Sequence, residues 1–384
     1  MLATHSVLVK DDLPELIALV DAVMRDGSDQ SFLTDYPLVY RDGNLKNIHV
    51  VKVGGAIVAE VPYIPKWVRC ERCELGLGII SPTATDPKHR HRGYGLACVR
   101  AAAAQMQRLG VELSILWTQV ATFPFYEHAG FQAVRDLCTV YPLYAADAPL
   151  FADHGHEVVI RDPTSGEDLE DLHRLHAQQG PGVVRSADEC AALLSLPRMR
   201  TLVARSGGRS VAYVVASAAP NRPGLVEGAG DAEALETLLC HTLSNWQGPE
   251  PVPAYGTCAP TSLGHVLERA VRERRVPWGQ STMIRINLVR RFFESIAPWL
   301  QRRAARVASA FSLEVSDTGE TISFEPGHGG LHLGEQRLDD HHVLSRRELT
   351  SAVFGEHLER RVKIPAPLRR LFPFSFPIWQ LDHS

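Results

Sequence analysis

The sequence predicts an α/β protein with two consecutive units, each built on a mixed sheet flanked by helices, and a smaller α+β segment at the C-terminus. Three observations lead to this prediction. Strand and helix patterns alternate over residues 1–145, and the same order of elements begins again near residue 157. From about residue 288 the pattern differs, with a basic helical stretch followed by short strands. We therefore expect three domains, over residues 1–145, 156–287 and 288–384.

The first unit opens with a short strand over residues 6–10 and a helix over 13–20. Its apolar residues Leu13, Leu16, Leu19 and Val20 share one helical face. Strands over 47–53 and 56–63 flank Gly54-Gly55, a two-residue hairpin signal.

Elements of both kinds continue to residue 141. A strand is expected over 74–85, and a helix over 93–109, where apolar residues recur three or four apart and Gly110 can end the helix. The ranges 112–118, 123–129 and 131–141 then predict a strand, a short helix and a final strand. This order is typical of a mixed sheet with helices on its faces.

A linker over 145–155 separates this unit from a second one with a similar order of elements. We expect a strand over 157–161, a helix over 166–177 and a hairpin whose strands, 201–204 and 210–217, meet at Gly207-Gly208. A strand over 225–230, a helix over 231–246 with Asp231 as its cap, and strands over 253–258 and 283–289 complete the unit. The similarity is a weak internal repeat, in element order rather than identity.

The C-terminal segment begins with a basic helical stretch over 288–307. Short strands follow over 311–316, 321–324 and 331–333, and Ser345 with Glu348 forms a capping box for a helix over 345–354. A tail rich in Pro and Phe ends the chain.

Composition excludes several classes of protein. A chain that is 45% hydrophobic and 22% charged is neither wholly disordered, nor a collagen, nor a coiled coil. The net charge of −4 predicts no general attraction to nucleic acid or anionic membranes. The sequence has no membrane-length apolar run and no signal-peptide pattern, and seven scattered cysteines suit free thiols in a reducing compartment. We expect a cytoplasmic protein.

The segment Thr83–Val99, TATDPKHRHRGYGLACV, carries the clearest chemistry. A strand runs through a basic turn into a helix, whose N-terminal amides and dipole favour an anion. Gly93 and Gly95 let the backbone approach a diphosphate, and Lys88, Arg90 and Arg92 add positive charge. GxxxxGK[ST] is absent and no GxGxxG lies between a strand and a helix, so the pattern leaves the diphosphate unidentified.

Two blocks of this sequence resemble the GCN5-related N-acetyltransferase (GNAT) superfamily. Arg90-His91-Arg92-Gly93-Tyr94-Gly95 is similar to its Gln/Arg-x-x-Gly-x-Gly/Ala signature, and Phe125-Tyr126-Glu127-His128-Ala129-Gly130-Phe131 is similar to its second block. The resemblance implies acetyl-CoA as cosubstrate. Its implied cofactor-binding residues are Thr83, Ala84, Thr85, Arg90, His91, Arg92, Gly93, Tyr94 and Gly95.

The layout of the whole chain resembles the enhanced-intracellular-survival (Eis) subgroup. That resemblance implies tandem GNAT folds, a sterol-carrier-protein-like domain over 288–384 and a closed homo-oligomer, with a hexamer as one arrangement. The second unit has Glu227-Gly228-Ala229-Gly230-Asp231-Ala232 where a phosphate turn would lie. Its acids would repel a diphosphate, so we expect 156–287 to be a non-catalytic copy that shapes the acceptor cleft.

Acetyl transfer to an amine needs an acid for the departing thiolate and a base for the amine. Tyr126 matches the family tyrosine and is the candidate acid. The alternative interpretation is that its aromatic ring serves only for packing. In the subgroup the C-terminal carboxylate is the base, which here is that of Ser384. The subgroup tends to end on an aromatic residue, so this tail departs from its pattern, and Asp382, His383, Glu74 and Asp86 stay open as alternatives.

Other clusters carry weaker signals. Cys70 and Cys73 form a lone CxxC without a second pair, and the histidine pairs lack an HExxH pattern. We therefore expect no metal. Cys98 is expected to be a small buried thiol.

These observations favour an acetyl-CoA-dependent N-acetyltransferase acting on a primary amine of a small molecule or of a lysine side chain. Its partners would be acetyl-CoA and the amine, with no nucleic acid and no membrane. Two alternatives stay open: a CoA-binding regulatory module without turnover, and a lipid carrier that uses the C-terminal segment.

Overall fold

The computed structural model describes residues 3–25, 30–163, 165–166, 168–219, 223–257 and 261–383. They form two units, each with its own sheet. The first unit comprises residues up to 33, 39–136 and 279–375, and the second comprises 34–38, 137–278 and the C-terminal segment from residue 376. The chain therefore leaves the first unit, returns to it after residue 278, and ends in the second.

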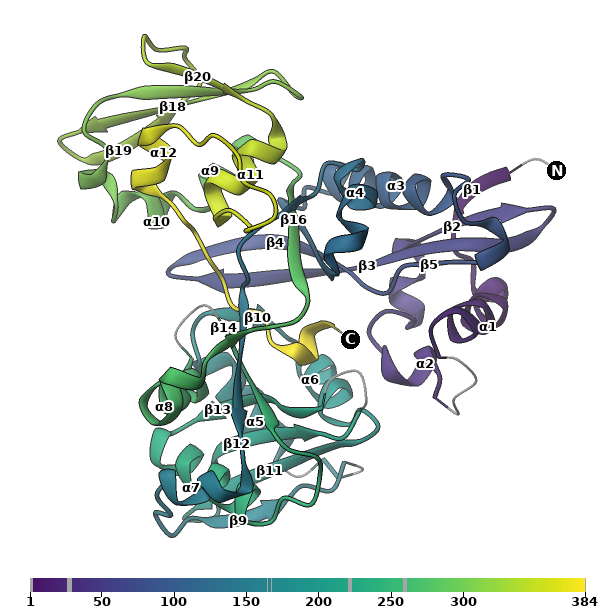
Figure 1. Ribbon diagram of the computed structural model, residues 1–384, viewed down its shortest axis with the longest axis vertical. Helices are drawn as coiled ribbons and strands as arrows, with labels where there is room; N and C mark the ends of the chain where they lie inside the picture. Colours follow the sequence, from purple (N-terminus) through teal and green to yellow (C-terminus); the bar gives the residue numbers. More distant parts are fainter. Residues whose placement is uncertain are drawn as a thin grey trace. The chain divides into compact units, whose positions relative to one another are not determined.

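The first sheet is mixed. Its strands follow the order β1-β2-β3-β4-β6-β16-β7, with β5 paired to β3, and β4 and β6 are parallel to each other (Figure 1). The strands are β1 (Ala3–Val7), β2 (Ile48–Val53), β3 (Ala56–Cys70), β4 (Cys73–Ile80), β5 (Ala84–Thr85), β6 (Leu113–Thr118), β7 (Gln132–Ala133) and β16 (Ser281–Ile286).

The predicted hairpin is confirmed. β2 and β3 pair antiparallel on either side of Gly54-Gly55, and both glycines have positive φ, as the tight turn requires. β3 extends to Cys70, further than its predicted end at residue 63. The predicted strand over 74–85 is two strands, because pairing with β3 stops at Ile80 and resumes at Ala84.

This sheet packs against α1 (Leu13–Met24), α3 (Tyr94–Arg108) and α4 (Phe123–Glu127). The short helix α2 (Phe32–Asp35) follows α1 in the chain. The buried face of α3 includes Val99 and Met106 as predicted, together with Cys98 and Ala102, and it packs with Val61 and Tyr63 of β3. This packing fixes the start of α3 beside the end of β4.

Strand β16 corrects a prediction. The range 283–289 was expected to close the second unit, but β16 lies in the first sheet between β6 and β7. In Figure 1 this green strand lies among the blue strands of that sheet. The apolar residues of a strand indicate that it is buried but not which strand it pairs with, and Met283, Ile284 and Ile286 are fully buried there.

A reciprocal correction applies to the predicted strand over 131–141. It is two strands, β7 in the first sheet and β8 (Cys138–Leu143) in the second. The second sheet thus includes β8, and the first includes β16.

The second sheet repeats the layout of the first. Its order is β9-β11-β12-β13-β14-β8-β15, again with one parallel pair, β13 and β14, before the exchanged strand. The strands are β9 (Glu157–Ile160), β11 (Met199–Ser206), β12 (Arg209–Ser217), β13 (Gly224–Gly230), β14 (Val252–Thr257) and β15 (Val276–Pro277). The weak internal repeat is therefore confirmed at the level of topology.

Four helices and a short strand complete the second unit. These are α5 (Leu169–Gln178), β10 (Gly182–Val184), α6 (Ala187–Leu194), α7 (Ala232–Ser244) and α8 (Ser262–Val271). The Asp231 cap of α7 is confirmed, whereas α6 has no counterpart in the sequence prediction. The core is formed by α7 and α8 against the sheet, with Leu235, Leu239 and Leu267 fully buried.

Residues 289–371 form a smaller α+β segment. Its four-stranded sheet has the order β19-β18-β17-β20, from β17 (Phe311–Val315), β18 (Glu320–Gly327), β19 (Gly330–Gly334) and β20 (His341–Leu344). The helices are α9 (Val289–Ser295), α10 (Ala297–Gln301), α11 (Arg346–Phe354) and α12 (Ala366–Leu371). The predicted helix over 288–307 is thus divided, while the Ser345–Glu348 capping box is confirmed.

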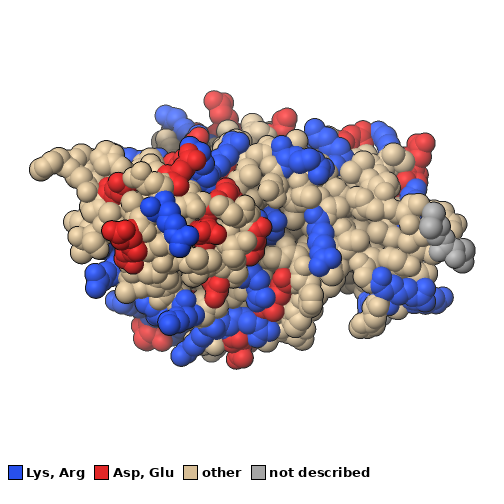
Figure 2. Space-filling model, turned by 90° about the horizontal axis from the view of Figure 1, so that it is seen from above, with Lys and Arg blue, Asp and Glu red and all other residues tan. Residues whose placement is uncertain are grey.

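The surface agrees with the near-neutral composition. On the face drawn in Figure 2, basic and acidic side chains are interspersed. Among the described residues, none of the helices has both the length and the apolar character needed to cross a lipid bilayer.

The placement of β16 gives the first testable prediction. Ile284 is fully buried and pairs with Ile115 of β6, so we expect Ile284→Ala to lower the free energy of unfolding by about 2–5 kcal/mol. Hydrogen exchange should quicken in peptides from β6. Peptides from β14 are the control, and faster exchange there with β6 unchanged would contradict the assignment.

Candidate functional site

A cavity lies where β4 and β6 separate. The two strands pair only from Leu77–Leu113 to Ile79–Ile115. β4 then ends at Ile80, and the chain pairs with β3 again at β5. The cavity has a volume of about 790 Å³ and is lined by residues that follow both strands, with the start of α3 and the end of α1.

Most of the predicted site residues meet in this cavity. Its lining includes Thr83, Thr85, Arg90, His91, Gly93, Tyr94, Gly95 and Tyr126. The other two predicted cofactor-binding residues lie outside the lining: Ala84 is buried in β5, and Arg92 is exposed.

The N-terminus of α3 faces the cavity without a side-chain cap among the described residues. Gly93 precedes the helix with φ of 80°, a left-handed conformation that strains residues with a Cβ. A Cβ on Gly95 would lie 2.9 Å from Oγ1 of Thr85 and 3.3 Å from the Phe125 ring. Gly95 therefore lets the helix start pack closely against Thr85 and Phe125, whereas the space beside Gly93 is open. The first amides of α3 are available to an anion because no described side chain caps them.

Positive charge surrounds this helix start. Arg90 lies on the cavity wall, with its Nε donating to the Thr85 carbonyl at 3.3 Å, and Arg92 is exposed. Helix amides flanked by guanidinium groups form a favourable site for a phosphate or diphosphate.

Tyr126 also lines the cavity. Its side chain is 8% exposed, and Phe125 and Phe131 contact it edge to face, at centroid distances of 4.8 and 6.2 Å. Burial raises the pKa of the phenol, and a hydrogen bond with Thr83 offsets part of this rise. The phenol is therefore protonated at neutral pH and able to donate a proton into the cavity.

Several lining residues were missed by the sequence analysis. They are Val23, Met24, His89, Leu96, Thr122, Phe125 and His128. Phe125 and His128 lie inside the quoted second block, which was the available signal. Val23 and Met24 come from the end of α1, about sixty residues before the motif, and no local pattern connects them to it.

Two candidate bases of the first unit have other roles. Glu74 is exposed and its Oε1 pairs with Nε of Arg69 at 2.7 Å, across the β3–β4 hairpin. Asp86 caps the turn after β5. The Lys88 backbone N–H and the His89 ring bind its carboxylate and hold its pKa below the usual range. Neither residue lines the cavity.

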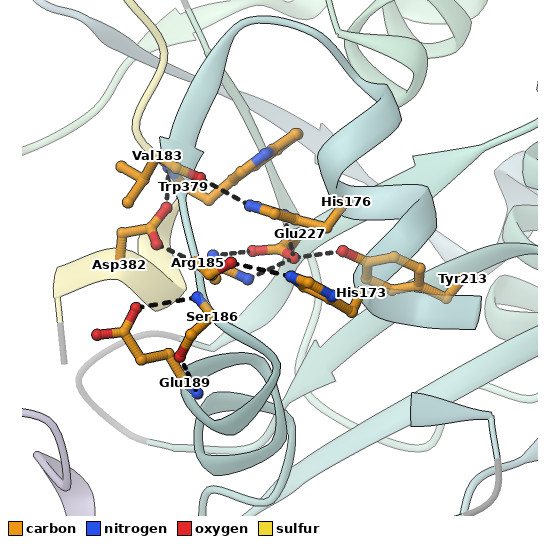
Figure 3. A network of polar contacts seen from close by, with 10 residues as sticks. All are labelled: His173, His176, Val183, Arg185, Ser186, Glu189, Tyr213, Glu227, Trp379 and Asp382. Carbon is orange, nitrogen blue, oxygen red and sulfur yellow. Dashed lines mark hydrogen bonds and ion pairs between the residues drawn. The ribbon is translucent and has the colours of Figure 1, made fainter. Parts of the chain in front are cut away.

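The candidate bases near the C-terminus belong to the second unit. Asp382 is fully buried, and its Oδ1 accepts from Nε of Arg185 at 2.7 Å (Figure 3). His383 is 8% exposed and lies beside the Trp278 ring, at a centroid distance of 5.6 Å. Ser384, the other predicted catalytic residue, lies outside the described residues.

Arg185 is the centre of a buried ionic network that the sequence analysis did not find. Its two terminal nitrogens pair with both carboxylate oxygens of Glu227, at 3.0 and 2.6 Å, and the Tyr213 hydroxyl donates to Glu227 at 2.6 Å. In Figure 3 these groups converge from β12, β13, the residue after β10 and the C-terminal segment. The partners are separated by 42 and 197 residues, so no local spacing could predict them.

The second unit lacks an open anion site at the equivalent helix start. The carboxylate of Asp231 accepts from the backbone N–H groups of Glu233 and Ala234, which are the amides that a phosphate would bind. Glu227 was expected to repel a diphosphate from the helix start. It is instead buried and paired with Arg185.

The cysteines and the CxxC segment have structural surroundings. Cys70 and Cys73 face each other across the β3–β4 hairpin as buried cysteines, and Sγ of Cys70 lies 2.9 Å from the Ser375 carbonyl. Cys98 is buried in α3 as predicted, and burial raises the pKa of its thiol to about 12.

Comparison with known proteins supports a GNAT domain in the first unit. Residues 6–134 match the family described as the acetyltransferase (GNAT) domain. No curated protein matches the chain.

Solved structures resemble nearly the whole chain. A GCN5-related N-acetyltransferase from Anabaena variabilis ATCC 29413 is 12% identical, with a TM-score of 0.71 over 98% of this chain and 99% of that one. A probable N-acyltransferase from Enterococcus faecalis V583 is 16% identical, with a TM-score of 0.71 and 99% of both chains covered. Eis1 from Mycobacterium abscessus is 14% identical, with a TM-score of 0.63 over 97% of this chain and 99% of that one.

These similarities confirm the predicted mixed α/β architecture and the GNAT domain. At such identities the structures show the fold alone. The sterol-carrier-protein-like character of residues 288–384 and the three domain boundaries stay predictions.

The ionic network gives the second testable prediction. We expect Glu227→Gln to lower the free energy of unfolding by about 3–5 kcal/mol at pH 7, because it leaves Arg185 buried without its bidentate partner. Glu233 is exposed, so Glu233→Gln is the matched control and should change the free energy of unfolding by less than about 0.5 kcal/mol.

The pH dependence of this effect has a definite sign. Burial alone would raise the pKa of Glu227, but the charges and hydrogen bonds of Arg185 and His176 together outweigh it, so the folded-state pKa lies below the ordinary value of 4.5. The stability that Glu227 contributes is therefore complete above pH 4.5 and is lost as the pH falls. Urea unfolding should show the full difference in unfolding free energy between the wild type and Glu227→Gln at pH 7. This difference should become smaller below pH 4.5, and a difference that increases in acid would contradict the assignment.

Proposed function

We propose that this protein is an acetyl-CoA-dependent N-acetyltransferase that acetylates a primary amine of a small molecule or of a lysine side chain. We assign the reaction to residues 1–145 and the acceptor-shaping role to 156–287. The observation that carries the proposal is the cavity at the separation of β4 and β6, where an uncapped helix start and a buried, protonated tyrosine face the same space.

The first step of the argument concerns the diphosphate of acetyl-CoA. The amides at the start of α3 and the guanidinium of Arg90 suit its charge, and the space beside Gly93 is open for close contact. Gly95, the other glycine of the proposed binding loop, lets the helix start pack closely against Thr85 and Phe125. His91, Arg92 and Tyr94 complete the proposed binding loop.

The second step concerns the pantetheine arm. Beyond Ile79, β4 has no partner on its β6 side among the described pairs, so its edge can hydrogen-bond the amides of the arm. Thr83, Ala84 and Thr85 continue this edge and would direct the thioester towards Tyr126.

The third step is the transfer itself. The amine nitrogen attacks the thioester carbonyl carbon, a C–N bond forms and the C–S bond breaks. Tyr126 donates its phenolic proton to the departing thiolate, and a base accepts the proton that the amine loses. We propose the Ser384 carboxylate as this base; its support is the family resemblance.

Two further parts of the proposal concern the protein's setting. Described cysteines such as Cys73 and Cys98 are free thiols, which supports a reducing, cytoplasmic location. A homo-oligomer, with a hexamer as one arrangement, is supported by the resemblance to the Eis subgroup.

Tyr126→Phe tests the chemistry. Removing the hydroxyl leaves the ring packing intact, so we expect kcat to fall by about 10²–10⁴-fold while the affinity for CoA is retained. Thiol release from acetyl-CoA with a panel of primary amines measures the rate, and calorimetry measures CoA binding. Tyr144→Phe, which alters an exposed tyrosine outside the cavity, is the control.

Two results would contradict the proposal in different ways. No CoA binding by the wild type, together with no thiol release with any amine, would exclude the enzyme altogether. An unchanged kcat in Tyr126→Phe would leave the transferase in place and remove Tyr126 as the acid.

The base is tested at the C-terminus. Appending Gly-Ser keeps every residue through Ser384 but moves the terminal carboxylate two residues away. We expect kcat to fall at least 10²-fold with CoA binding and melting temperature unchanged. The same dipeptide added at the N-terminus is the control, and equal rates for the two extended proteins would exclude the terminal carboxylate as base.

A further inference from the structure

The second unit contains a cavity of its own, which we call the α7 cavity. It has a volume of about 560 Å³, within the range of small-molecule sites, and lies at the C-terminal end of α7. Its floor comes from β11 and β12, and its wall from the last turn of α7 and the proline-rich segment 246–253. It is therefore at the other end of the helix from the start that Asp231 caps.

The interior of the α7 cavity is mainly apolar. Leu202 and Ala216 form part of the floor, and Trp246, Pro249 and Pro251 form part of the wall. This composition favours a hydrocarbon chain or a ring over a fully polar ligand.

The polar groups of the wall are satisfied within the protein. The Thr242 hydroxyl donates to the Leu238 carbonyl at 2.6 Å, and the Trp246 indole N–H donates to the Pro249 carbonyl at 3.1 Å. The amide of Asn245 donates to the His241 carbonyl at 2.8 Å and so caps the end of α7, which would otherwise favour a cation. These groups need no ligand.

The charged residues of the lining have one sign. Arg198 and Arg200 line the cavity, and no carboxylate of the described residues does. Glu250, between two of the lining prolines, accepts instead from the backbone N–H of Ala145 at 2.7 Å. Arg200 is exposed and lies beside the apolar lining, so its guanidinium is available to an anion.

We propose that the α7 cavity binds a monocarboxylate with an apolar body. The body lies against Leu202, Ala216 and Trp246, and the carboxylate pairs with Arg200 beside Arg198. A guanidinium matches a carboxylate in shape as well as charge, which selects an acid over the corresponding alcohol. This site is independent of acyl transfer and of the cavity at the start of α3.

Decanoate is a suitable probe and decanol its uncharged counterpart. Calorimetric titration of the full-length protein should show saturable decanoate binding, with decanol at least tenfold weaker. Arg200→Gln should lower the affinity for decanoate at least tenfold and leave the affinity for decanol nearly unchanged. Arg209→Gln, at the opposite end of the same hairpin and outside the lining, is the matched control and should bind both as the wild type does.

A second variant tests the apolar part. Ala216→Leu adds volume to the floor and should weaken both probes, with circular dichroism confirming that the protein is folded. If that variant fails to fold, Leu202→Ala, which enlarges the cavity, replaces it and should change the affinity for decanol.

Three outcomes would overturn the proposal. They are the absence of saturable decanoate binding up to 1 mM, equal affinities for decanoate and decanol, and decanoate binding that neither the arginine nor the floor variant alters, which would place the probe elsewhere.

Discussion

The short parallel pairing of β4 with β6 is the constraint on which the proposed site depends. Three residue pairs join the strands, and beyond them β4 ends while β6 continues to Thr118 with β16 on its other side. A longer pairing would satisfy the edge of β4 with protein hydrogen bonds and would fill the space between the strand ends. The separation instead leaves a polar backbone edge, a helix start and a tyrosine around one cavity.

The two units show how one topology can keep or lose an anion site through a few residues. In the first, Gly93 precedes α3 and no described side chain occupies its amides. In the second, Asp231 precedes α7 and its own carboxylate occupies them. An internal carboxylate at this position stabilises the helix and excludes a phosphate by charge. The second helix start is therefore complete without a ligand, whereas the first is not.

The sequence predicted what depends on local patterns and failed where distant strands meet. Gly54-Gly55, the face of α3 and the Ser345–Glu348 capping box each arise from neighbouring residues, and all were found. The exchange of β8 and β16 was missed because the apolar residues of a strand indicate that it is buried but not which strand it pairs with. The same reason hid Arg185, since its partners are distant in sequence and an isolated arginine gives no periodic signal.

The C-terminal segment shows why a buried ionic network can specify the position of a chain segment better than apolar packing alone. Trp379 and Leu381 are buried in the second unit, and apolar contacts of this kind tolerate a shift of the chain at modest cost. A shift would also separate Asp382 from Arg185, leaving charges unpaired at a site from which water is excluded, which costs several kcal/mol. The bidentate pair with Glu227 fixes the guanidinium, and its Nε then admits a carboxylate at one position only. The network therefore specifies the register of the last residues of the chain, which packing by itself would leave less well defined.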